Sequence, residues 1–553
     1  MMTQPIDFQT HPAAYRHWRV TYAGEIANLF MDVDEDGGLF DGYQLKLNSY
    51  DLGVDIELAD IVQRMRFEHP EVKVVILRSG KDNVFCAGAN IRMLGGASHA
   101  LKVNFCKFTN ETRNNFEAAE ADSGQKYIAA VKGSCAGGGY ELALACNYIM
   151  LTDDSSSAVS LPEVSLLAVL PGTGGLTRVT DKRKVRRDRA DIFCSVEEGV
   201  RGKRAVEWRL VDELAPNASF DQAVMDQAHK FAAQMRAKAD KGIALNPIAR
   251  SFGEDGSISY SLLDLEVDRD RRRATITIKG PDGKAPDSID ALVALGDQSY
   301  LLRLARELDD AILHLRFNEV QLGLLIFRAQ GDPHAVLDHE DFLIKYKNHW
   351  LAKEILGNWK RVLKRIDLTS RSLVALVEHG SCFAGCLAEL LWAVDRSYMM
   401  SGEFEGDDRD PACILLGESN FTCYPMSNGL TRLENRFLGE PQSVEKAKSR
   451  LGKPIDVAEA VDLGLVTYAL DDLDWEDEVR IFMEERASFS PDAMTGMEAN
   501  LRFAGPETME TRIFGRLTAW QNWIFQRPNA VGEKGALQRY GTGKRGDYDM
   551  QRV

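Results

Sequence analysis

Two short segments rich in glycine and alanine contain the residue types needed to stabilise a negatively charged oxygen. They are Phe85-Cys-Ala-Gly-Ala-Asn90 and Gly133-Ser-Cys-Ala-Gly-Gly-Gly-Tyr-Glu141. Small side chains leave backbone N–H groups accessible, and two N–H groups that converge on one carbonyl oxygen form an oxyanion hole. We predict Ala89 and Gly138 as the two donors, with Gly138 just before a helix whose dipole favours a negative oxygen. The alternative for either segment alone is a tight turn that only permits close packing.

Two glutamates lie in or near these segments. Glu141 falls on the first turn of an expected helix over 140–146, and Glu163 lies in Leu161-Pro-Glu-Val-Ser165. Two carboxylates that face one pocket can hold a water between them, one as base and one as acid. The alternatives are that Glu141 only complements the helix dipole and that Glu163 is a solvent-exposed loop residue. Taken together, the donors and carboxylates indicate an enzyme that stabilises the enolate of a thioester.

Composition excludes several function classes. The chain has 553 residues, of which 44% are hydrophobic and 27% charged, so it can bury at least two cores. A formal charge of -16 argues against nucleic-acid binding. We find no secretory signal and no apolar run long enough to span a membrane, and therefore expect a cytoplasmic protein. The nine cysteines form no CxxC pairs and have no histidines at zinc spacing, so no metal site is expected.

The chain contains an internal duplication. Ser49-Tyr50, Arg66-Phe67 and Arg78 recur with an offset of 250 residues, as Ser299-Tyr300, Arg316-Phe317 and Arg328. Gly175-Leu-Thr-Arg178 recurs later as Gly429-Leu-Thr-Arg432. Buried strands alternate with amphipathic helices in each copy, which predicts an α/β fold with a mainly parallel sheet. The expected domains are a catalytic copy over 1–235, a linker with an opening hairpin over 236–290, a second copy over 291–475, and a helical C-terminal region with a tail over 476–553.

The second copy differs where the chemistry would lie. Gln330-Gly-Asp-Pro-His334 stands in place of the first donor segment. Counting from the shared Gly-Ser-Cys puts Ala388 at the position of Glu141, with Glu389 one residue late. No acid falls in the local context of Glu163, and the nearest run is Leu415-Leu-Gly-Glu418-Ser. We therefore expect one active copy and one degenerate copy that supports it or forms an interface.

The set of motifs resembles the crotonase (enoyl-CoA hydratase/isomerase) superfamily. The matching segments are Phe85–Ile91, Gly137–Glu141, Leu161–Glu163 with Pro171–Arg178, and Leu45-Lys-Leu-Asn48. The resemblance implies a crotonase-like fold over residues 15–235, with the second copy as a degenerate unit of the same kind. It also implies catalytic roles for Glu141 and Glu163 and coenzyme A contacts at Lys46 and Ala87.

Three features depart from a simple hydratase: the duplicated length, the extension Met31–Phe40 before Lys46, and Asn90 where many members have Asp. The length and the endings Trp523–Gly532 and Gly535–Gly543 resemble a ring-cleaving branch of the superfamily. That resemblance implies opening of 2,3-epoxybenzoyl-CoA (2,3-dihydro-2,3-dihydroxybenzoyl-CoA) with two waters, giving 3,4-dehydroadipyl-CoA semialdehyde and formate, in aerobic benzoate degradation. It implies a catalytic contribution from Cys106, no cofactor apart from the coenzyme A of the substrate, and a homodimer.

Three other interpretations stay open at the level of sequence. A plain enoyl-CoA hydratase or isomerase would use the same two glutamates on another acyl-CoA. A non-catalytic acyl-CoA-binding protein would need neither glutamate. Cys106 taken alone is typical of a packed core thiol. A dinucleotide enzyme is disfavoured, because no GxGxxG opens a βαβ unit.

Overall fold

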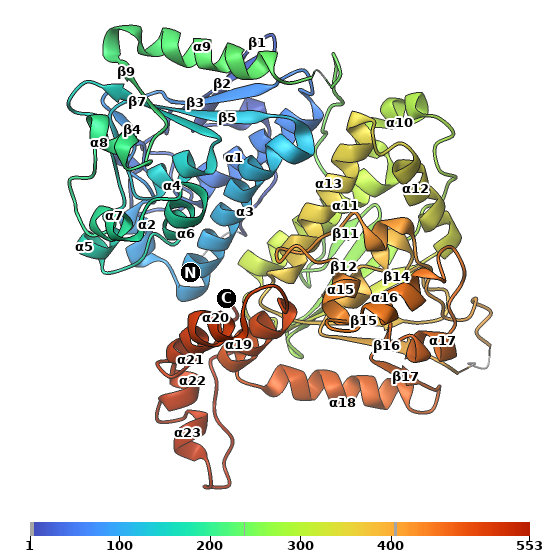
Figure 1. The fold of residues 1–553 in the computed structure, drawn as a ribbon. Coiled ribbons are helices and arrows are strands. Elements are labelled where there is room, and N and C mark those ends of the chain that lie inside the picture. The colour runs from blue at the N-terminus through green and yellow to red at the C-terminus, as the bar shows by residue number, and fades with distance from the viewer. Residues whose placement is uncertain (1–4, 237, 403–405) are drawn as a thin grey trace. The chain divides into compact units, whose positions relative to one another are not determined.

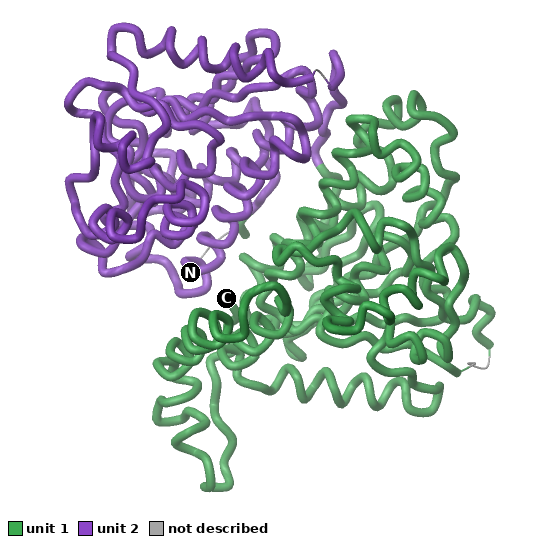
Figure 2. Tube along the Cα trace, viewed as in Figure 1, with its two compact units in different colours: residues 1–6, 248–553 green, residues 7–247 purple. Residues whose placement is uncertain are grey.

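The computed structural model describes residues 5–236, 238–402 and 406–553, which form two compact units (Figure 2). The N-terminal unit lies within 7–247, and the C-terminal unit lies within 248–553 and also includes Pro5 and Ile6. The sequence predicts further domain boundaries near residues 235, 290 and 475. Whether the chain divides there stays a prediction. No helix in the described part of the chain is long and apolar enough to cross a membrane.

The N-terminal unit is built on a six-stranded sheet in the order β1-β2-β3-β5-β7-β9 (Figure 1). Its strands are β1 (Trp18–Ala23), β2 (Ile26–Met31), β3 (Val74–Ser79), β5 (Lys126–Val131), β7 (Tyr148–Asp153) and β9 (Glu213–Pro216). The first pair is antiparallel and the other pairs are parallel. The central strands are continuous apolar runs because helices cover both faces of such a sheet.

The helices of this unit divide between its core and its surface. They are α1 (Leu52–Phe67), α2 (Ile91–Gly96), α3 (His99–Ser123), α4 (Gly138–Ala145), α5 (Glu163–Leu167), α6 (Gly175–Thr177), α7 (Arg187–Phe193), α8 (Gly202–Glu207) and α9 (Phe220–Ala233). Val224 and Ala228 on α9 pack against Ile76 and Ile128 of the sheet. Buried helix α4 has small residues at its start, so its backbone can approach the neighbouring strand closely.

A second, three-stranded parallel sheet carries the predicted site. Its order is β4-β6-β8, with β4 (Val84–Cys86), β6 (Ser134–Ala136) and β8 (Ala158–Ser160). Parallel strands end at the same edge, and the two donor segments and Glu163 follow these three ends. The small sheet therefore brings together residues that are more than 70 positions apart in the chain.

The C-terminal unit repeats the large sheet and confirms the duplication. Its sheet has the order β10 to β17, with β10 (Arg250–Phe252), β11 (Ile258–Tyr260), β12 (Leu263–Asp268), β13 (Arg273–Lys279), β14 (Leu324–Gln330), β15 (Ser372–Val377), β16 (Arg396–Met400) and β17 (Tyr468–Leu470). From β12 onward the pattern is that of the first unit: one antiparallel pair followed by parallel pairs. Isolated bridges take the place of the small sheet.

Helices surround this second sheet. They are α10 (Ile289–Leu295), α11 (Tyr300–Asn318), α12 (Pro333–Lys345), α13 (Trp350–Asp367), α14 (Leu390–Ala393), α15 (Arg432–Arg436), α16 (Pro441–Lys448), α17 (Val457–Asp462), α18 (Trp475–Ser488), α19 (Pro491–Arg502), α20 (Met509–Thr511), α21 (Thr518–Ile524), α22 (Pro528–Val531) and α23 (Ala536–Arg539). The expected helical C-terminal region is present in α18 to α23.

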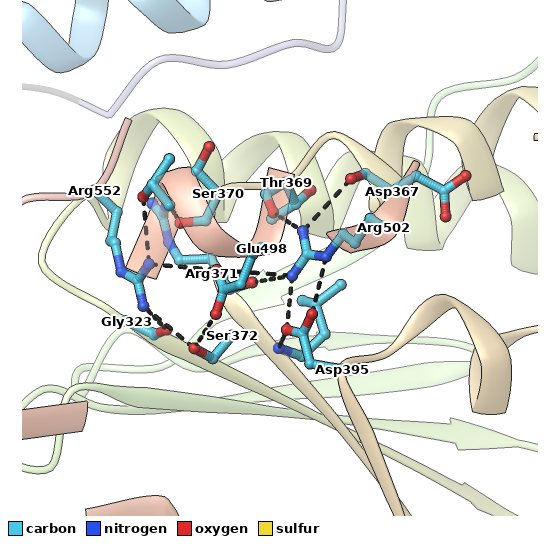
Figure 3. A network of polar contacts seen from close by, with 12 residues as sticks. Gly323, Asp367, Thr369, Ser370, Arg371, Ser372, Asp395, Glu498, Arg502 and Arg552 are labelled. Carbon is cyan, nitrogen blue, oxygen red and sulfur yellow. Dashed lines mark hydrogen bonds and ion pairs between the residues drawn. The ribbon is translucent and has the colours of Figure 1, made fainter. Parts of the chain in front are cut away.

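A buried polar network fastens this helical region to the second sheet (Figure 3). Arg502 donates to Asp395 at 2.8 Å and to the Thr369 carbonyl at 2.6 Å. Arg552, near the end of the chain, donates to Glu498 at 3.4 Å and to the Gly323 carbonyl at 3.2 Å. Because these charges are buried and hydrogen-bonded, removing one partner would leave another buried charge uncompensated. The network thus holds α19 and the segment around Arg552 against the sheet.

Candidate active site

The two predicted donor turns lie against each other. Gly88 has φ of 88°, and a Cβ built on it would lie 2.8 Å from the Gly138 nitrogen. Ala89 follows this turn, and Gly138 is the first residue of α4. Neither the Ala89 nor the Gly138 N–H donates to an acceptor within the described residues. The two turns therefore meet with both N–H groups free in the described chain, which is the arrangement that an oxyanion hole requires; their role as donors to a substrate stays a prediction.

Glu141 is held in a fixed orientation on the first turn of α4. Its side chain is buried, with 2% of the residue exposed. Its Oε1 accepts a hydrogen bond from the Gly175 N–H at 2.7 Å, and the Thr173 hydroxyl donates to Oε2. The loop 171–175, which the sequence analysis placed after Glu163, is therefore the support for Glu141.

Glu163 faces the second donor turn from the start of α5. A Cβ built on Gly137 would lie 2.9 Å from Glu163 Oε1. The residue is 9% exposed, so it is not the solvent-exposed loop glutamate of the alternative interpretation. Its Oε2 is buried and has no hydrogen-bond partner in the described chain. Burial, and secondly the negative charge of Glu141, raise the pKa of Glu163 to about 7. The two carboxylates thus differ in environment, as a proton donor and a proton acceptor in one site must.

Cys106 lies on α3 and is half-buried. Burial, followed by the negative charge of Glu141, raises the pKa of its thiol to about 11. The thiol is consequently protonated at neutral pH and is suited to weak hydrogen bonding, since only a thiolate is a strong nucleophile. The charge of Glu141 thus acts on the Cys106 thiol, and a catalytic contribution from Cys106 stays a prediction.

The coenzyme A candidates lie beside the first donor turn. The Ala87 N–H donates to the Leu47 carbonyl at 3.1 Å, and Lys46 precedes Leu47 with its side chain exposed. Leu47 and Asn48 both have positive φ, 58° and 53°, a conformation that costs energy for side chains other than glycine. Asn48 offsets this cost with hydrogen bonds to three backbone groups, those of Met31, Val33 and Phe85, which belong to two other segments. The turn therefore presents the exposed Lys46 side chain beside the first donor segment, where a phosphate could meet it.

The second unit has glutamates at the positions of both catalytic candidates, so the count from Gly-Ser-Cys is wrong by one residue. Ala384 bridges to Leu415 as Ala136 bridges to Ser160 in the small sheet. Glu389, five residues after Ala384, therefore corresponds to Glu141, which is five after Ala136. One extra residue before Ala384 shifted the count, and no sequence signal marks that insertion.

Glu418 corresponds in the same way to Glu163, because each lies three residues after the bridged residue. The two positions nevertheless differ in environment. The Glu418 side chain is 55% exposed. Glu389 is fully buried, and its oxygens accept from Asn420 at 2.7 Å and Arg432 at 3.2 Å. Glu389 is thus held by protein donors as Glu141 is, and the two units differ at Glu418, whose exposure agrees with a degenerate second copy.

Sequence reasoning missed three residues of the N-terminal site: Tyr50, Arg113 and Thr173. Tyr50 had a signal, because Ser49-Tyr50 recurs as Ser299-Tyr300. The only sequence signal for Thr173 was its position in a glycine-rich loop. Arg113, on α3, had no sequence signal. The described residues contain no group of three His, Cys, Asp or Glu side chains that could hold a metal ion.

Comparison with known proteins assigns the chain to a family. Residues 44–245 match the family model for enoyl-CoA hydratase/isomerase. The benzoyl-CoA-dihydrodiol lyase of Aromatoleum evansii is 53% identical over 551 residues, covering 99% of this chain and 98% of that protein. The fatty acid oxidation complex subunit alpha of Idiomarina loihiensis is 32% identical over 199 residues, which cover 36% of this chain and 27% of that protein.

A crystal structure of enoyl-CoA hydratase from Bacillus anthracis is 26% identical, with a TM-score of 0.34, over 39% of this chain and 77% of that one. The family model covers the segment that carries all four donor and carboxylate positions. The similarity to the Aromatoleum protein, in contrast, extends through both units and the C-terminal helices. The chain therefore belongs to the benzoyl-CoA-dihydrodiol lyase branch of the crotonase (enoyl-CoA hydratase/isomerase) superfamily.

Proposed function

We propose that this protein is a ring-cleaving carbon–carbon lyase that acts on 2,3-epoxybenzoyl-CoA. With two waters it would form 3,4-dehydroadipyl-CoA semialdehyde and formate, in aerobic benzoate degradation. Near-full-length similarity to a benzoyl-CoA-dihydrodiol lyase supports the reaction class. The observation that carries the mechanism is the pair of buried carboxylates, Glu141 and Glu163, beside two free backbone donors.

The proposed chemistry begins with the thioester carbonyl, which accepts hydrogen bonds from Ala89 and Gly138. Glu163, whose raised pKa keeps part of it protonated near neutral pH, gives its proton to the epoxide oxygen as the ring opens. Glu141, fixed by two donated hydrogen bonds, orients and deprotonates the attacking water. A ring C–C bond then breaks, and its electron pair is delocalised into the thioester enolate held by the two donors. A second water then adds to the aldehyde carbon bonded to the thioester α-carbon; the bond between these two carbons breaks, the carbon leaves as formate, and the electron pair forms the thioester enolate, which is then protonated.

Lys46 and Ala87 would contact coenzyme A, and the neutral thiol of Cys106 would contact the substrate or a water near Glu141. The residues named need no cofactor beyond the coenzyme A of the substrate. We also propose a homodimer, which the family resemblance implies, and a cytoplasmic location, which the sequence predicts.

A product assay distinguishes this proposal from its rivals. Purified protein is given 2,3-epoxybenzoyl-CoA or crotonyl-CoA, and formate and CoA thioesters are quantified. We expect formate in step with epoxide loss, with little hydration of crotonyl-CoA. Hydration of crotonyl-CoA without formate would show an ordinary hydratase, and no turnover of either would favour an acyl-CoA-binding protein.

A further inference from the structure

Tyr50 contacts both donor turns of the oxyanion hole. Its N–H donates to the Gly88 carbonyl at 3.0 Å, and its carbonyl accepts from the Asn90 N–H at 2.8 Å. These two bonds lie on either side of Ala89 and leave the Ala89 N–H facing away from Tyr50. The Tyr50 hydroxyl lies against Gly138, where any Cβ would overlap it. One residue therefore fixes the first donor through its backbone and touches the second with its side chain.

Arg113 completes this link from α3. Its Nη2 donates to the Tyr50 hydroxyl at 2.9 Å and to the Gly138 carbonyl at 3.1 Å, while Nη1 donates to the Thr109 carbonyl at 3.2 Å. A planar guanidinium holds such acceptors in one fixed geometry, which a lysine ammonium does not. Arg113 thus fixes the start of α4, where the Gly138 N–H must point at the substrate.

The positive charge of Arg113 also acts on the oxyanion hole. The residue is 1% exposed, and its charge interacts with those of Asp55 and Glu141. Burial raises the pKa of Tyr50 well above its usual value, and the charge of Arg113 offsets this only in part, so the phenol stays neutral. Among groups sheltered from water, a fixed positive charge behind a donor favours negative charge on the oxygen in front of it.

We propose that Tyr50 and Arg113 are positioning residues of the oxyanion hole. They hold the Ala89 and Gly138 N–H groups at one separation, and Arg113 places a buried cation behind the second donor. This inference rests on the proposed use of both N–H groups by the thioester. It predicts that small changes at either residue weaken polarisation of the thioester carbonyl, although neither residue contacts the substrate.

The test combines kinetics with infrared spectroscopy of bound benzoyl-CoA labelled with ¹³C at its carbonyl. Tyr50→Phe removes one oxygen and leaves the backbone bonds in place. We expect kcat to fall by about 10- to 100-fold with little change in KM, because the donors are misplaced rather than removed. The carbonyl band should move back toward its position in free benzoyl-CoA. The matched control is Tyr300→Phe, which removes the hydroxyl of the buried counterpart residue in the second unit, where it donates to the Lys279 carbonyl at 3.0 Å; kcat and the band should not change.

The carbonyl band in Arg113 variants provides a second, independent test. Arg113→Lys keeps the charge but loses the planar fork, so part of the band shift should survive, whereas Arg113→Met should abolish it. A wild-type band and wild-type kcat in Tyr50→Phe would overturn the positioning role. If the wild-type protein itself causes no band shift, the two donors do not bind the carbonyl, and the proposed function fails at its first step. These two failures give different spectra and are therefore distinguishable.

Discussion

Replacing Glu163 with glutamine should stabilise the protein at alkaline pH while removing its activity. In the unfolded chain this carboxyl has a pKa of 4.5, and in the folded protein burial and the charge of Glu141 raise it to about 7. The folded protein therefore binds the proton more tightly than the unfolded chain. Its contribution to stability is complete below pH 4.5 and is lost as pH rises through 7.

The size of the effect follows from the difference between the two pKa values. Ionising Glu163 in the folded protein costs about 3 kcal/mol more than ionising it in the unfolded chain. Glutamine has nearly the same shape and never ionises, so Glu163→Gln should not show this loss. Between pH 4.5 and pH 8.5, the free energy of unfolding of the variant should rise by about 3 kcal/mol relative to that of the wild type. For a unit of this size, this corresponds to roughly 6–12 °C in Tm.

The assay is thermal unfolding of both proteins at the two pH values, reported as a double difference. Other buried carboxyls with raised pKa values, such as Glu340 and Glu389, cancel because both proteins contain them. The matched control is Glu418→Gln, which replaces the exposed counterpart in the second unit and should leave the pH dependence of Tm unchanged. A double difference near zero for Glu163→Gln would show that this carboxyl is not desolvated, and the reasoning would be wrong.

Three further predictions address the same site. Glu141→Gln should lower kcat by about 10²- to 10⁴-fold. It should also lower the apparent pKa of Glu163 in a pH–rate profile, because the variant lacks the negative charge beside Glu163. An unchanged profile would contradict the electrostatic coupling of the two carboxyls. Gly138→Ala should reduce kcat sharply in ring-opening assays, because the new methyl overlaps the Tyr50 hydroxyl, and normal turnover would show that the turn has room. Cys106 should react slowly with iodoacetamide at pH 7.5 and faster toward pH 11, as followed by mass spectrometry; rapid labelling at pH 7.5 would contradict a protonated thiol.

The parts of the site that depend on local backbone could be predicted from the sequence. Glycines at 88 and 137 adopt positive φ at the donor turns, and Glu141 lies on the first helical turn after them. Both features follow from neighbouring residues, because a turn that requires positive φ favours glycine. The repeated strand and helix patterns likewise predicted the duplicated sheet.

Other features depend on contacts between distant segments and left no local pattern. The raised pKa of Glu163 requires the packing of α5 near Glu141, and the bonds of Arg113 join α3 to α4. The correspondence of Glu389 with Glu141 depends on a strand bridge that one inserted residue hides from a sequence count. Such features follow from tertiary structure, which composition and spacing do not encode.

The central claim is that the first unit performs the ring opening with Glu163, while its counterpart in the second unit takes no part. The most direct test is single-turnover formate release from 2,3-epoxybenzoyl-CoA by Glu163→Gln and by Glu418→Gln. The account predicts that the first variant releases little or no formate and the second releases it at the wild-type rate and yield. Wild-type formate release by Glu163→Gln, or its loss in a folded Glu418→Gln protein, would contradict the account.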